Sequence, residues 1–157
     1  MSKWKSALAL RPAQWALLWE AAIALAVAKS QVLLLSQRRL AELLVQMMVE
    51  GDDQVASGGS ADMAFSGNVA REIARVVRNS PIELACLPQA LAAYRMLGRR
   101  GIGSQVRLGA PLDCNGAREM HAWLKVGDTW VTGHCNEKRY ARFLPSQITH
   151  IAPSAFD

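Results

Sequence analysis

The sequence predicts an α+β fold in which helices come first and antiparallel strands follow. Residues 13–49 contain no Gly or Pro and are dominated by Ala, Leu, Glu, Gln and Arg, which are good helix formers. Residues 68–97 carry apolar side chains at intervals of three and four, the spacing of amphipathic helices. From residue 104 onward the pattern alternates as in strands, and residues 120–135 resemble a hairpin. Segregation of helices from strands along the chain is typical of the α+β class.

Size and composition suit a globular protein. The 157 residues fit one compact domain, with a helical part over 1–80 packed on a core over 81–157. Hydrophobic residues make up 51% and charged residues 20%, too apolar for a disordered chain. The net charge is +5, but the arginines are scattered along helices without a basic block, so nucleic-acid binding is not expected. An acidic peptide or partner protein suits this charge better.

The first helical region contains the apolar run "WALLWEAAIALAVAKSQVLLL" over residues 15–35. Four charged residues interrupt or flank it: Arg11, Glu20, Lys29 and Arg38. A membrane span needs about 18 or more uninterrupted apolar residues, so we expect neither a span nor membrane contact. The pattern predicts buried helix over 12–49, divided in two near Ser30 or Ser36. No cleavage site of a signal peptide follows the run.

The segment over residues 51–67 carries four glycines among Asp and Ser, which predicts a mobile loop. The next segment, "NVAREIARVVRNS", predicts an amphipathic helix that ends before Pro81. Its apolar face consists of Val69, Ile73, Val76 and Val77.

A further helix is predicted over residues 86–97. Pro88 is tolerated in a first helical turn because its missing N–H has no partner there. Gly98 and Gly101 terminate this helix. Its core-facing stripe consists of Leu87, Ala90, Leu91, Tyr94 and Leu97.

The remaining segments predict a small sheet. "SQVRLGA" alternates as a strand with Val106 and Leu108 on one face. "MHAWLKVGDTWVTGHC" predicts a hairpin that turns at Gly127-Asp128. The tail from Asn136 predicts a short strand or an irregular wrap.

Cys86 is the first candidate functional residue. The first turn of a helix has unpaired N–H groups and a partial positive charge, which stabilise a thiolate and lower its pKa. The alternative is that Cys86 is a small apolar core residue, since free cysteines are among the most buried residues. A nucleophilic thiol also needs a base, usually a histidine that the fold brings close.

Three histidines are candidates for that base. His121 opens the first hairpin strand, His134 lies near the end of the hairpin, and His150 lies in the tail. A strand histidine is often a packed core residue instead. If the turn has two residues, His134 lies opposite His121, and Asp128 lies about 20 Å from His121.

Cofactor and metal sites are not expected. Cys86, Cys114, His121, His134 and Cys135 could supply zinc ligands, but the chain lacks C-x-x-C and H-x-x-x-H pairs. "GRRGIG" follows a helix, which is the wrong context for a phosphate loop. The three cysteines are an odd number without tight spacing, which indicates a reducing compartment, so we expect a cytoplasmic protein.

Residues 84–131 resemble a known family. "CLPQALAAYRMLGRRGI", then "VRLGA", then "HAWLKVGDTWV" is similar to the transglutaminase-like cysteine proteases, and more closely to the leader peptidases of lasso-peptide biosynthesis. The resemblance implies a papain-like core, in which the Cys86 helix packs against a small antiparallel sheet that carries His121. It also implies that Cys86 is the nucleophile and His121 the general base.

The resemblance also defines what is missing. In the family an Asp about twelve residues after the histidine orients it, but this chain has Thr132-Gly133-His134 there. Asn136, Asp113 or Glu119 could substitute, and so could a backbone carbonyl or a water.

The function implied is a cysteine peptidase that removes the leader from a ribosomally made precursor during lasso-peptide maturation. The implied partners are the precursor peptide, a separate leader-binding protein and an ATP-dependent lasso cyclase. Two alternatives stay open: a non-catalytic peptide-binding module of the same fold, and a related hydrolase or amide-forming enzyme of another pathway. The apolar N-terminal helices could dock a partner or simply pack in the core.

Overall fold

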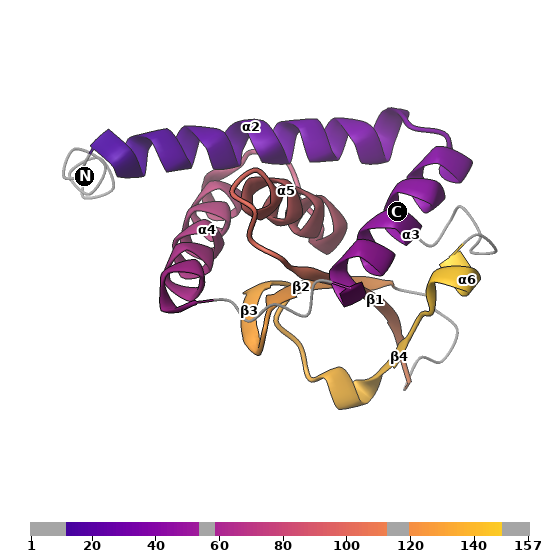
Figure 1. Ribbon diagram of the computed structural model, residues 1–157. Helices are drawn as coiled ribbons and strands as arrows, with labels where there is room; N and C mark the ends of the chain where they lie inside the picture. The colour runs from indigo at the N-terminus through magenta and orange to yellow at the C-terminus, as the bar shows by residue number, and fades with distance from the viewer. Residues whose placement is uncertain (1–11, 54–58, 113–119, 149–157) are drawn as a thin grey trace.

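The structure is a computed structural model that describes residues 12–53, 59–112 and 120–148. Helices occupy the first part of the chain and strands the second, as the sequence predicts (Figure 1). The helices are α2 (Pro12–Leu34), α3 (Gln37–Asp53), α4 (Ser60–Asn79), α5 (Cys86–Gly98) and the short α6 (Pro145–Ile148). The strands are β1 (Gln105–Pro111), β2 (His121–Val126), β3 (Thr129–Thr132) and β4 (Tyr140–Arg142), with a 3-10 turn η1 (Glu137–Arg139) before β4.

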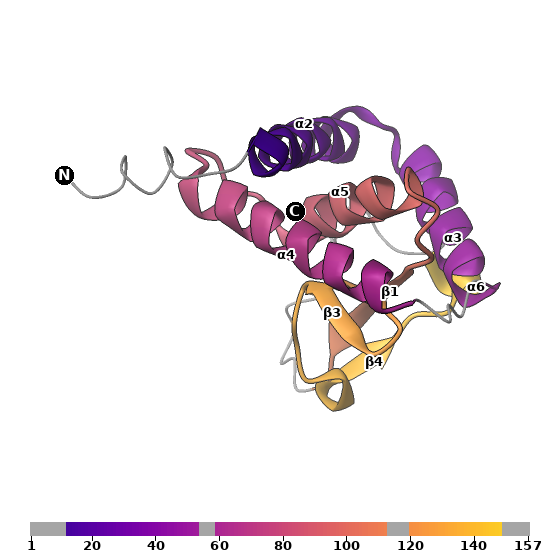
Figure 2. The same ribbon diagram turned by 60° about the vertical axis from the view of Figure 1, so that its left-hand side comes forward.

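The described elements form layers. The antiparallel sheet has the strand order β3-β2-β1-β4. Helices α4 and α5 lie against one face of this sheet, α2 lies across both of them, and α3 packs beside β1 and α6 (Figures 1 and 2). The fold is therefore α+β, and the helix that begins at Cys86 lies directly on the strand that begins at His121.

Helix α5 is the centre of the core. Four residues of its predicted stripe are buried, and they pack with Val106 and Leu108 of β1 in one cluster. Tyr94 is half-buried instead and donates its hydroxyl to the Glu50 carboxylate at 2.5 Å. The helix ends at Gly98, and Gly101 follows with φ +69°, a conformation that glycine adopts without strain.

The glycine-rich segment differs from its prediction as a loop. Helix α3 continues to Asp53 and α4 already begins at Ser60, while residues 54–58 lie outside the described residues. The carboxylate of Asp62 accepts the N–H of Gly59 at 3.3 Å and so caps the start of α4. Packing of Ser66 and Val69 outweighs the cost of about 1 kcal/mol for Gly67 inside a helix.

Helix α2 is less buried than the sequence predicts. It breaks before Gln37, near the predicted Ser36, but only Ala21, Leu25 and Ala28 are fully buried. Its outer face exposes large apolar side chains: Trp15, Trp19, Ile23, Val27, Leu33 and Leu34. By length and composition alone α2 could cross a membrane, although the sequence predicts no span because charged residues interrupt it. No other helix among the described residues is long and apolar enough to do so. Its inner face packs on α4 and α5.

The hairpin forms as predicted, with a change in register. Gly127 takes φ +55° in the turn between β2 and β3, and Val126 pairs with Thr129. An irregularity at Leu124/Lys125 then shifts the pairing by one residue, so that Leu124 faces Thr132. A bulge of this kind re-aims the residues beyond it.

Candidate functional site

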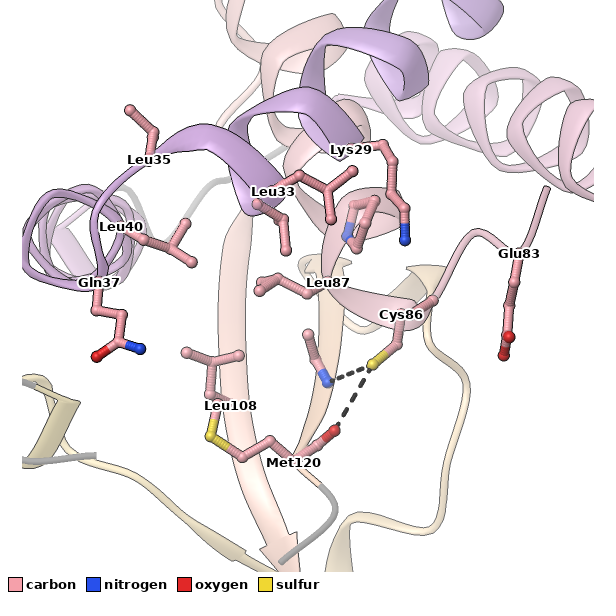
Figure 3. A pocket seen from close by; sticks show the side chains of 14 residues that line it. Lys29, Leu33, Leu35, Gln37, Leu40, Glu83, Cys86, Leu87, Leu108 and Met120 are labelled. Carbon is pink, nitrogen blue, oxygen red and sulfur yellow. Dashed lines mark hydrogen bonds between the residues drawn. The ribbon is translucent and has the colours of Figure 1, made fainter. Parts of the chain in front are cut away.

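Cys86 is the first residue of α5, where the sequence places it. The residue before it, Ala85, offers no side chain to cap the helix, and the first-turn N–H of Leu87 bonds the Cys86 sulfur instead. The half-buried thiol lies against β2 (Figure 3): it accepts the N–H of Ala122 at 3.4 Å and faces the carbonyl of Met120 at 3.8 Å.

His121 begins β2 opposite Gly109 of β1. Its imidazole stacks on the Trp123 ring with centroids 5.9 Å apart and lies 5.3 Å from the Tyr140 ring. These two rings restrict the imidazole plane, and the imidazole shares a hydrogen bond with the Cys86 thiol. The structure thus brings together Cys86 and His121, which 34 residues separate in the sequence.

The second nitrogen of His121 is held by a backbone group. Nε2 lies 2.9 Å from the carbonyl oxygen of Gly133, twelve residues further along. Because a carbonyl only accepts, Nε2 carries the proton, and Nδ1 is left unprotonated in the neutral ring. A backbone carbonyl, one of the substitutes considered above, therefore occupies the position of the missing carboxylate.

Gly133 is suited to this contact by its conformation. Its φ is +65°, and a Cβ on it would lie 2.2 Å from the Ala122 oxygen and 2.9 Å from the Trp123 Cα. Only a residue without a side chain can approach β2 so closely. The prediction that His134 lies opposite His121 is wrong, because the register shifts by one residue at Leu124/Lys125 and β3 ends at Thr132, before His134.

The electrostatics of the pair favour an ionised thiol. Burial raises the pKa of Cys86, but the hydrogen bond to His121, the N–H groups of Ala122 and Leu87, and the His121 charge together lower that pKa below its ordinary value. The hydrogen bond to Cys86 raises the pKa of His121 against the effect of burial, and the Gly133 carbonyl raises it further. Each group thus favours the charged form of the other.

The other candidate residues lie elsewhere. His134, Cys135 and Asn136 line a cleft of about 350 Å³ together with His121. The side chain of Asn136 accepts the N–H of Lys138 at 3.2 Å, so it caps η1. Cys114, Asp113, Glu119 and His150 lie outside the described residues. Within the described ranges, no three His, Cys, Asp or Glu side chains are grouped to hold a metal ion.

One supporting group was not anticipated from the sequence. Glu137 accepts the indole N–H of Trp123 at 3.0 Å and pairs with Arg107 at 3.1 Å. This carboxylate ties η1 to β1 and β2, next to the strand that supplies Tyr140. A lone glutamate in a basic tail gives no sequence signal for that role. Gly133 gave a weak signal, as a glycine directly after a β-prone run.

A thiol at the start of a helix, set against an imidazole on an antiparallel sheet, defines a papain-like class of α+β protein. A family model described as the transglutaminase-like superfamily matches residues 17–145, and the chain belongs to that superfamily. Enzymes of this superfamily generally use a cysteine and a histidine. Neither a curated protein nor a solved structure matches the chain.

Proposed function

We propose that this protein is a cysteine peptidase that removes the leader peptide from a ribosomally made precursor during lasso-peptide maturation. The observation that carries the chemistry is the contact of Cys86 with His121, whose Nε2 is fixed by the Gly133 carbonyl. The resemblance of residues 84–131 to the lasso-peptide leader peptidases supports the substrate class. In this proposal Cys86 is the nucleophile and His121 the general base.

The first half of the reaction forms a thioester. The Cys86 thiolate attacks the carbonyl carbon of the scissile amide, and the resulting oxyanion accepts hydrogen bonds from first-turn N–H groups of α5. The N-cap residue Ala85 makes no side-chain bond to them, and Pro88 has no N–H. The candidate donors are therefore the N–H groups of Cys86 and of Leu87, the second of which also bonds the Cys86 sulfur. The C–N bond then breaks as the His121 imidazolium gives its proton to the leaving amine.

The second half returns the free enzyme. His121 takes a proton from a water molecule, which attacks the thioester, and the thiol leaves as the acid forms. Both halves need the His121 nitrogen beside Cys86 to exchange a proton while the other nitrogen stays bound. The Gly133 carbonyl meets this need by holding the Nε2–H tautomer. It brings no negative charge to the imidazolium, so its contribution is smaller than that of a carboxylate.

The resemblance also supports the partners. We propose that a separate leader-binding protein presents the precursor peptide and that the product passes to an ATP-dependent lasso cyclase. The reaction belongs in the reducing cytoplasm, where Cys86 stays a free thiol. The chemistry requires no cofactor.

The test combines the full chain with its precursor and the leader-binding protein, and detects leader removal by mass spectrometry. We expect cleavage by the parent and by Cys135→Ala, and none by Cys86→Ala. Equal cleavage by Cys86→Ala and the parent would refute the role of Cys86. Folding of each variant is checked by circular dichroism.

A second candidate is a non-catalytic module of the same fold that only holds a peptide for a partner enzyme. The observation in its favour is that His121 contacts a neutral carbonyl and not a carboxylate. Alkylation separates the two candidates, since a module needs no reactive thiol and its cysteines would label slowly and equally. A hydrolase or amide-forming enzyme of another pathway shares the thiol chemistry, and it would act on other amides while leaving the precursor intact.

A further inference from the structure

A cleft of about 530 Å³ opens beside Cys86 and shares no described lining residue with the cleft that contains His121 and Tyr140. Three parts of the fold form its walls: the corner between α2 and α3, the start of α5, and strands β1 and β2 (Figure 3). Most of the side chains that line it are apolar, chiefly Val32, Leu33, Leu35, Leu40, Leu108 and Met120. The charged residues among the lining are Lys29 and Glu83.

The α2–α3 corner holds its wall in place by its own bonds. The N–H of Leu35 donates to the Gln31 carbonyl at 3.0 Å, and the N–H of Leu40 donates to the Ser36 carbonyl at 3.0 Å. Leu40 is only 3% exposed and anchors α3 in the core. Leu33 keeps 67% of its surface exposed, so an apolar group in the cleft can still cover it. The corner thus presents a fixed wall with an uncovered apolar surface.

From these walls we infer that the cleft binds an aliphatic side chain of the substrate, within two residues of the attacked carbonyl. Cys86 itself lines the cleft, and an extended peptide advances about 3.3 Å per residue, so the entering side chain belongs to a residue next to the scissile bond. An aliphatic group covers the leucines, whereas a polar group would lose its water in a cleft whose described lining, Cys86 aside, includes only three polar side chains, those of Lys29, Gln37 and Glu83. The N-terminal helices thereby take part in substrate selection.

This inference rests on the proposed function for its peptide substrate, but its test does not need the precursor. The probes are dipeptidyl acyloxymethyl ketones, in which the Cys86 thiolate displaces the carboxylate leaving group. Leu, Asn or Gly occupies either of the two residues before the ketone. The rate of inactivation at low probe concentration measures how well each side chain is accepted.

The chain offers a matched pair of variants. Leu33 and Leu34 are neighbours at the end of α2 and both are exposed, but Leu34 lines a separate groove with Ala26 and Val27. We expect the parent to react about tenfold or more faster with a Leu probe than with the Asn probe. Leu33→Asn should lose most of that preference, while Leu34→Asn should keep it. Both variants should react with iodoacetamide at the parental rate, which shows an intact Cys86.

The outcomes separate the two proposals. Three results would overturn the proposal that the cleft binds an aliphatic side chain. The parent could react at equal rates with all probes, or the two variants could behave alike. The third is that no probe reacts with a Cys86 that iodoacetamide still labels. A clear Leu preference that Leu33→Asn abolishes supports the cleft even if the precursor is never cleaved, in which case only leader removal fails.

Discussion

The two cysteines that the structure describes line two different clefts, and their surroundings shift the thiol pKa in opposite directions. Burial has the largest effect on both and raises both pKa values. At Cys86 a histidine and backbone N–H groups reverse that effect, so its pKa falls below the ordinary value. At Cys135 the carboxylate of Glu137 adds to burial, and the pKa rises. The hydrogen-bond donors around a thiol, more than its exposure, therefore distinguish a reactive cysteine from an inert one.

The largest expected effect comes from removing the imidazole. His121→Ala deletes both the hydrogen bond and the charge that lower the pKa of Cys86, so the alkylation rate of Cys86 at neutral pH should fall toward that of Cys135. Precursor cleavage should fall by about 100-fold to 10,000-fold, the usual contribution of a general acid–base residue. The matched control is His134→Ala. The His134 ring packs on Trp130, so its removal should leave the alkylation rate of Cys86 and the cleavage rate unchanged. Equal losses in the two variants would remove His121 from the proposed reaction.

The second prediction uses the unmodified protein and varies the pH. Because the folded pKa of Cys86 lies below its ordinary value, its thiolate should form first as pH rises, and iodoacetamide should label Cys86 before Cys135. The interaction of the thiolate with His121 contributes stability above the ordinary thiol pKa, which is lost as pH falls through the lowered value. Peptide mass spectrometry after timed labelling gives the labelling rate of each cysteine as a function of pH. Identical pH dependences for Cys86 and Cys135 would contradict the opposite pKa shifts of the two thiols.

The local part of this site could be predicted from the sequence, and the non-local part could not. A run of helix formers with Pro88 near its beginning places Cys86 at a helix start, because those signals act within one turn. The meeting with His121 depends on the whole fold and came only from the family resemblance. The Gly133 contact was missed because a regular two-residue hairpin places His134 there, and a bulge changes every later position by one.

The start of helix α4 and the buried face of helix α2 could not be predicted from the hydrophobic pattern either. Helix α4 begins eight residues earlier than predicted, because a cap at Asp62 and burial of Ser66 outweigh the glycines. The apolar residues of helix α2 are spread around the helix, so the pattern predicts no single buried face. The structure distinguishes the face on α5 from the exposed one.

A third, smaller effect tests the carbonyl that holds His121. Gly133→Ala should displace this carbonyl, because the new Cβ would lie 2.2 Å from the Ala122 oxygen. Losing the fixed tautomer should slow cleavage roughly tenfold, less than the ~10,000-fold effect of a wrong tautomer in a serine protease triad. Nitrogen NMR of the imidazole reports the tautomer directly, and it should change from Nε2–H to a mixture.

Gly127→Ala is the matched control for that prediction. Gly127 also has a positive φ, but a Cβ there would meet nothing within 4 Å. It should therefore lose about 1–2 kcal/mol of unfolding free energy from backbone strain alone and keep the parental tautomer. A tautomer that stays Nε2–H in a folded Gly133→Ala variant would show that another group orients His121.

The smallest expected effect concerns Cys135, the thiol whose pKa is raised. Glu137→Gln removes a negative charge near Cys135 but keeps an oxygen that can accept the Trp123 indole N–H. The pKa of Cys135 should move down toward its ordinary value without reaching it, because burial is the larger cause of its shift. Loss of the ion pairs with Arg107 and Lys125 should cost no more than about 1 kcal/mol of unfolding free energy, since these pairs are partly exposed. Alkylation of Cys135 should become slightly faster while that of Cys86 stays constant. A matching change at Cys86 would mean that Glu137 acts on the whole sheet through Trp123, so that the two thiols are not independent.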